Sequence, residues 1–95
     1  SHSYALNYAV QYGHVAMIQY LVEVFSMKLE WRNFYGEASV ANGKLEVAQW
    51  LYGNCTFTYT PKDEALNTSL KCALQKGNLA FVEWTRGQGA ELPPK

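Results

Sequence analysis

The segment Gly13-His14-Val15-Ala16-Met17-Ile18-Gln19-Tyr20-Leu21 decides the fold, because the chain repeats its pattern twice more. The second copy, at 43–51, reads GKLEVAQWL, and the third, at 77–85, reads GNLAFVEWT. The three leading glycines are spaced by 30 and 34 residues. A period of ~20–50 residues is typical of stacked supersecondary units that share one extended core. The sequence therefore predicts a repeat protein, a class that usually acts through its surface rather than through a catalytic pocket.

The residues after each glycine predict a helix with one buried face. Apolar residues recur at steps of three and four in each copy, as in Val15, Ile18 and Leu21, and this is the spacing of a buried helical stripe. Gln19 has polar equivalents in both other copies, so we expect this column to face solvent. An aromatic column is expected to pack in the core or to line a shared groove: it consists of Tyr20, Trp50 and Trp84.

The residues before each glycine predict a second, shorter helix, at 6–12, 36–42 and 70–76. Each segment carries a small residue followed by an aliphatic one, such as Ala9 and Val10, which suits close packing between helices. The glycine then ends this helix, because it adopts the left-handed backbone geometry at little cost. Each unit is expected to be a helix, a tight turn and a second helix, so the predicted fold class is all-α.

These units resemble the ankyrin repeat. The shared features are the small-aliphatic pair, two variable positions, a Gly-His-Leu-like phrase such as Gly13-His14-Val15, and a second helix that ends in Leu-Leu-like residues. Gly89-Ala90-Glu91-Leu92 is similar to the family's Gly-Ala-Asp-Val phrase, and the Trp50-Leu51 ending is similar to divergent arrays of water moulds, other protists and giant viruses. The resemblance implies one ankyrin-like α-solenoid domain of three units, at 1–28, 29–60 and 61–92, with a tail at 93–95.

The chain also departs from the family pattern. The family's Thr-Pro-Leu-His phrase is replaced in every unit, for example by Tyr4-Ala5-Leu6-Asn7. The second unit is short, so Asn33-Phe34-Tyr35-Gly36 is expected either in its first helix or at the tip of a turn. Thr85 and Arg86 stand where the second unit has an apolar pair, which predicts a polar C-terminal cap that faces solvent.

The first helix is unusually aromatic for the end of a stack. It carries Tyr4, Tyr8 and Tyr12, and no unit precedes it in this sequence. Because the chain begins without Met, we expect it to be a piece of a larger protein. Two interpretations stay open: preceding repeats cover this helix in the parent protein, or another chain covers it, which includes self-association through the first helix.

Composition argues against several functions. Eight Lys/Arg balance eight Asp/Glu, so nothing resembles the basic stripe of a nucleic-acid-binding protein, including an RNA-reading solenoid. No apolar run reaches the ~18 residues of a membrane span. Cys55 and Cys72 fit no metal spacing, and His14 is expected to serve the turn. Asp63-Glu64, after Pro61, is typical of a helix start rather than of an acid–base pair. We therefore expect no enzyme activity, no cofactor and no metal.

The preferred hypothesis is an intracellular, by default cytoplasmic, protein-interaction module with a concave binding surface. The alternative is a structural or spacer segment of a longer array. Trp31 is open between two interpretations, an exposed binding anchor or a side chain that fills the core beside the short second unit. Partner-binding residues are predicted in the connection and at the variable positions before each glycine: Gln11, Tyr12, Trp31, Arg32, Asn33, Phe34, Asn42, Gln75 and Lys76.

Overall fold

A computed structural model describes residues 2–32, 39 and 42–92 of the chain. The described residues form five helices and no strand, so the all-α prediction is confirmed. Glu30 and Thr56 make an isolated parallel bridge. The helices are α1 (His2–Tyr12), α2 (Val15–Phe25), α4 (Leu45–Asn54), α5 (Lys62–Lys76) and α6 (Leu79–Gly87).

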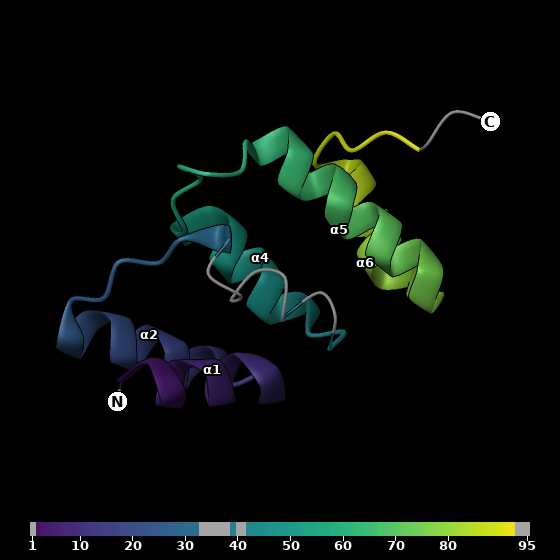
Figure 1. Cartoon of the computed structure of the whole chain (residues 1–95). Helices are drawn as coiled ribbons and strands as arrows, with labels where there is room; N and C mark the ends of the chain where they lie inside the picture. Colours follow the sequence, from purple (N-terminus) through teal and green to yellow (C-terminus); the bar gives the residue numbers. More distant parts are fainter. Residues whose placement is uncertain (1, 33–38, 40–41, 93–95) are drawn as a thin grey trace.

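The helices are arranged in successive layers along the chain. Helix α1 packs against α2, α2 contacts α4, and α5 packs against α6. Figure 1 shows α4 between the α1–α2 pair and the α5–α6 pair. The radius of gyration is 13.0 Å, close to the ~12–13 Å expected for a compact chain of this length. The first and third units are therefore two helical hairpins on either side of α4.

The three repeated glycines have the same backbone role. Gly13, Gly43 and Gly77 adopt φ angles of +78°, +68° and +66°. The next amide donates to the carbonyl of the small residue five positions earlier: His14 to Ala9 (2.8 Å), Lys44 to Ser39 (2.8 Å) and Asn78 to Ala73 (2.9 Å). This bond across a left-handed residue is a Schellman helix end. The predicted turns are therefore confirmed in all three copies.

The residue after each glycine also begins the second helix. The carbonyls of His14, Lys44 and Asn78 accept from the amides four residues later over 3.0, 3.0 and 3.1 Å. Only Asn78 adds a side-chain cap, because its Oδ1 accepts from the amide of Phe81. The turn thus consists of a single glycine, and in the first and third units this short link holds α1 against α2 and α5 against α6.

The core combines apolar columns from all three units. Leu6 and Val10 of α1, Ile18 of α2, Leu51 of α4 and Phe81 of α6 are completely buried in one cluster. Burying a side chain of this size contributes ~1.5–3 kcal/mol. The predicted solvent column is confirmed, because its three members are exposed. They are Gln19, Gln49 and Glu83.

Some expectations need correction or lie outside the described residues. The first helices of the first and third units extend further toward the N-terminus than predicted. Of segment 36–42, only Ser39 and Asn42 are described, and Ser39 is buried. The prediction of a solvent-facing polar cap is wrong at Thr85, which is buried. Its hydroxyl donates to the helix carbonyls of Phe81 and Val82, so its polar group is satisfied without water. Arg86 is exposed, as predicted.

Candidate interaction surface

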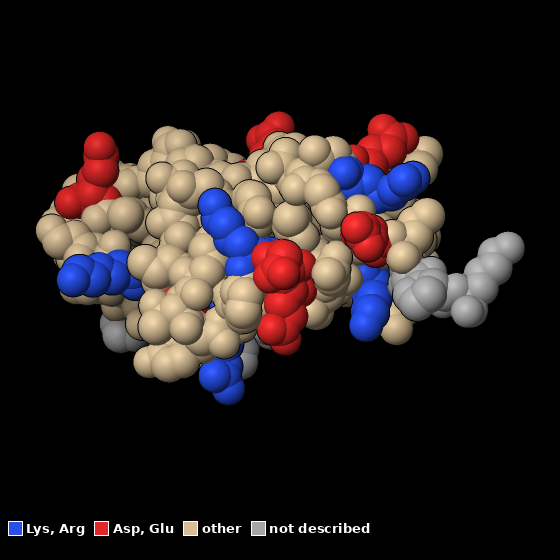
Figure 2. All heavy atoms as spheres, turned by 90° about the horizontal axis from the view of Figure 1, so that it is seen from above, with Lys and Arg blue, Asp and Glu red and all other residues tan. Residues whose placement is uncertain are grey.

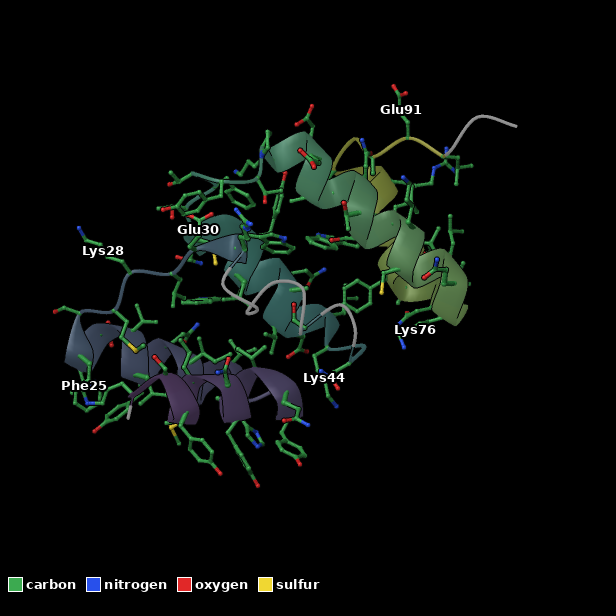
Figure 3. All side chains as sticks on the ribbon, in the orientation of Figure 1. Phe25, Lys28, Glu30, Lys44, Lys76 and Glu91 are labelled. Carbon is green, nitrogen blue, oxygen red and sulfur yellow. The ribbon has the colours of Figure 1, made fainter. Side chains whose placement is uncertain are left out.

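The turns carry the first group of predicted binding residues. Gln11 and Tyr12 end α1, Asn42 precedes Gly43, and Gln75 and Lys76 end α5. All five are exposed. We call these five residues the turn row. Figure 3 shows Lys44 and Lys76 at the edge of the molecule where the turns lie, away from Lys28 and Glu30.

Neighbouring turns contact each other in a repeated way. The Cδ atom of Lys44 lies 3.2 Å from the position of a Cβ on Gly13, and Asn78 Nδ2 lies 3.4 Å from the same position on Gly43. Lys44 and Asn78, which each follow a turn glycine, thus pack on the turn glycine of the preceding unit. Beside this contact is an open hollow of about 380 Å³, and its lining includes Tyr12, Gly13, Gly43, Lys44 and Glu46. The turn row therefore has a concave section between the first and second units.

The second group of predicted residues lies in the connection that follows α2, at the start of the second unit. Trp31 is 3% exposed, and its ring stacks on Phe57 with the centroids 5.6 Å apart. Of the two interpretations of Trp31, the exposed anchor is therefore wrong and the core-filling side chain is confirmed. Arg32 is exposed and lies over the Tyr59 ring at 5.6 Å. Asn33 and Phe34 lie outside the described residues.

Trp31 belongs to an aromatic cluster that joins the second and third units. Tyr52 meets Trp31, Phe57 and Trp84 edge-on at 6.1, 5.6 and 5.6 Å. Lys62 Nζ lies 4.8 Å from the Tyr52 ring centroid, a cation–π distance. Burial, with the charge of Asp63 as a smaller cause, raises the pKa of Tyr52. These rings form packed structure, so they are not a free ligand site.

Glu30 is a buried carboxylate that the sequence did not single out. Its Oε2 accepts from the Thr56 hydroxyl at 2.6 Å and from the Thr58 amide at 3.2 Å. These bonds, led by that of Thr56, lower its pKa, although burial opposes them. Glu30 Oε1 has no hydrogen-bond partner among the described residues. The Glu30 carboxylate therefore links the connection that follows α2 to the connection that follows α4.

The two cysteines of the described chain are free thiols in partly buried positions. Burial, with the nearby charge of Glu30 as a smaller cause, raises the pKa of Cys55 to about 12. Cys72 is half-buried and, like Cys55, packs against the core with a free thiol. His14 is exposed at the first turn. Among the described residues, no group of three His, Cys, Asp or Glu side chains is placed to hold a metal ion.

The outward side of the first unit is the most apolar exposed surface described. Met17 is 50% exposed, whereas its equivalents Val47 and Phe81 are completely buried. Tyr8 is 53% exposed, whereas its third-unit equivalent, Cys72, is half-buried. Tyr20 is likewise exposed, whereas its equivalents Trp50 and Trp84 are half-buried. Positions that contact the preceding unit in the rest of the chain are therefore uncovered here. We call this surface the first-unit face, and its members are Tyr4, Tyr8, Tyr12, Met17 and Tyr20.

Charges of both signs lie on one face of the molecule. In Figure 2 the Lys and Arg side chains alternate with Asp and Glu on the face in view, and no area of one sign forms. In the described residues, no helix has the length and apolar character needed to cross a membrane. Searches for similar proteins found no family model, no curated protein and no solved structure that matches this chain.

Proposed function

We propose that the chain is an ankyrin-like stack of three helix–turn–helix units that acts as a non-catalytic protein-interaction module. Three copies of one turn, with the same backbone hydrogen bond of 2.8–2.9 Å, support this stack. So do the equivalent contacts of Lys44 on Gly13 and of Asn78 on Gly43. A stack of this kind presents side chains from successive units on one rigid surface.

The turn row is the proposed binding surface. The observation that carries the proposal is that each turn combines positions that repeat between units with exposed positions that differ between units. The structural positions repeat as glycine preceded by a small and an aliphatic residue, whereas the exposed positions differ from unit to unit. They are Gln11 and Tyr12 in the first unit and Gln75 and Lys76 in the third. Variable polar and aromatic groups on a fixed frame suit recognition of another protein, because little ordering is needed on binding.

The proposed partner is a protein segment rather than a nucleic acid. The chain has no net formal charge, and nucleic-acid affinity depends strongly on the number of phosphates that Lys and Arg neutralise. An intracellular, cytoplasmic location remains part of the proposal. The alternative function is a structural segment of a longer array, favoured by the uncovered first-unit face.

Selection from a displayed library of random peptides tests the turn row. Binders selected on the wild-type chain are then titrated against Lys76→Glu and against Lys28→Glu, a matched change of an exposed lysine away from the turns. We expect Lys76→Glu to weaken binding about tenfold, or ~1.4 kcal/mol, and Lys28→Glu to leave the affinity unchanged. Equal affinities for both variants would contradict the turn row, and a library without any binder would favour the structural segment.

A further inference from the structure

We infer that the first-unit face binds a second copy of this chain in a symmetric, antiparallel arrangement of two α1 helices. This inference goes beyond the proposed function, because it concerns a different partner and a surface that shares only Tyr12 with the turn row. The face includes Tyr4, Tyr8 and Tyr12, which succeed one another four residues apart along α1. Neighbouring rings lie 6.5 Å and 4.6 Å apart between centroids, so the three tyrosines form one continuous aromatic ridge.

The fold already uses this face as an interface elsewhere in the chain. Phe81, at the position of Met17, lies in the same buried cluster as Leu51 of the preceding unit. Trp84, at the position of Tyr20, contacts Tyr52 of that unit edge-on at 5.6 Å. The same columns are half-exposed in the first unit. Large aromatic side chains on an otherwise regular interface mark a surface suited to burial against another protein.

The shape and charge of the face favour an identical copy. A hollow of about 420 Å³ adjoins the ridge and is lined by Tyr4, Ala5, Tyr8, Ala9, His14 and Met17. Its volume has room for an aromatic ring. Residues 1–22 contain no Asp, Glu, Lys or Arg, so two copies meet at neutral pH without repulsion between side chains of like charge.

A two-fold axis beside Tyr8 satisfies the spacing of the ridge. Antiparallel α1 helices place Tyr8 next to its own copy and each Tyr4 near the Tyr12 of the other chain. Head-to-tail stacking fits less well, because exposed Arg86 replaces Tyr52 at the position that contacts the next unit. It would bring a charge onto the uncharged face, which costs free energy unless the charge finds a partner.

The area of the face sets the strength of this dimer. Five side chains that are each half-exposed or more provide about 500 Å² per copy, since an aromatic side chain presents ~150–250 Å². The pair then buries about 1,000 Å² in total, below the ~1,200 Å² at which stable specific interfaces begin and within the range of weak, transient complexes. The dimer is therefore expected to be weak and concentration-dependent.

Sedimentation equilibrium of the whole chain at about 5–500 µM, the range in which a micromolar dimer forms, tests the inference. Three variants are compared with wild type: Tyr8→Glu, Tyr8→Lys and the control Tyr59→Glu, which alters a more exposed tyrosine (66% against 53% for Tyr8) in another connection. Circular dichroism checks that each variant is folded. We expect wild type and the control to reach twice the monomer mass, each Tyr8 variant to stay monomeric, and an equimolar mixture of Tyr8→Glu and Tyr8→Lys to dimerise again.

Four results would overturn the inference. A wild-type chain that stays monomeric would show that this face does not bind a second copy. A mass that keeps growing with concentration would indicate head-to-tail stacking instead of a closed pair. A dimer that survives Tyr8→Glu lies on another surface. A mixture of the two Tyr8 variants that fails to dimerise excludes the antiparallel contact at Tyr8. Lys76 lies outside the first-unit face and Tyr8 lies outside the turn row, so the Lys76 variant tests peptide binding and the Tyr8 variants test the dimer separately.

Discussion

Thr56 donates its hydroxyl proton to a carboxylate oxygen of Glu30 over 2.6 Å. The two residues are 26 positions apart in the sequence, and their bond joins the connection that follows α2 to the connection that follows α4. Backbone bonds run alongside, from the amide of Thr56 to Leu29 and from the amide of Trp31 to Thr56. The charged side chain therefore holds the two connections in register and supports the burial of Trp31.

Glu30 makes stability depend on pH in the acid range. Its pKa in the folded chain is lowered from 4.5, chiefly by the Thr56 bond. A carboxyl with a lowered folded pKa stabilises the fold above its unfolded pKa and loses this contribution as the pH falls through the folded value. We expect the free energy of unfolding of wild type to decrease below pH 4.5. Glu30→Gln should be less stable at pH 7 and should vary less with acid.

Urea unfolding between pH 3 and pH 7 measures both effects. Glu83→Gln, which changes an exposed acid on α6, is the matched control and is expected to keep the wild-type pH dependence. A Glu30→Gln variant with the same acid slope as wild type would show that the carboxylate does not contribute in this way.

The turn glycines give a second prediction, on backbone geometry. Gly77 has a φ of +66°, and no atom lies within 4 Å of the position that a Cβ would take, so Gly77→Ala introduces backbone strain without a clash. The cost is expected to be ~1–2 kcal/mol. Gly87, at the end of α6, also has open space but no positive φ, so Gly87→Ala should be neutral or stabilising by up to ~1 kcal/mol. Thermal melting of both variants distinguishes the two, and equal effects would contradict the assigned turn.

Trp31 gives a third prediction, on the core. Trp31→Ala removes a buried ring and is expected to cost ~3–5 kcal/mol. At ~4–8 °C per kcal/mol for a domain of this size, this lowers the melting temperature by more than about 10 °C. Tyr12→Ala, at a half-exposed tyrosine, is the control and should change it little. A small change in the melting temperature of Trp31→Ala would contradict the burial of this side chain in the core.

Cys55 gives a fourth prediction, on thiol chemistry. Burial raises its pKa to about 12, and the thiolate is the reactive form. We therefore expect alkylation of Cys55 by iodoacetamide at pH 8 to be slow in the folded chain and fast in urea. A raised folded pKa also means that its contribution to stability is complete below the unfolded pKa, ~8.5, and is lost at higher pH. Mass spectrometry of peptides locates the label, and rapid native labelling of Cys55 would contradict its burial.

Sequence periodicity was sufficient to predict the repeated parts of this fold. A glycine after a small-aliphatic pair indicated each turn, and the apolar columns indicated the helices and most of the core. Thr85 was mispredicted because residue type alone does not show that a hydroxyl is satisfied by its own helix, here at the carbonyl of Phe81 over 2.9 Å. Met17 lies in an apolar column but is half-exposed, because no described residue covers the outward side of its unit.

The connections were harder to predict because they do not repeat. Trp31 stands in an irregular segment, so no column in another unit indicated that its ring stacks on Phe57. Glu30 gave no signal either, since its role depends on Thr56 and Thr58, which the sequence places far away. The turn row was predicted as exposed and is exposed, since helix ends next to a glycine turn lie at the surface.

Native-state hydrogen exchange, read by NMR at single amides, tests the three-unit account most directly. The amides of His14, Lys44 and Asn78 donate to Ala9, Ser39 and Ala73, so all three are expected to exchange far more slowly than in the unfolded chain. Protection at all three would establish the same turn in every unit. Protection of His14 and Asn78 with rapid exchange at Lys44 would contradict the account, because the second unit would then lack its first helix.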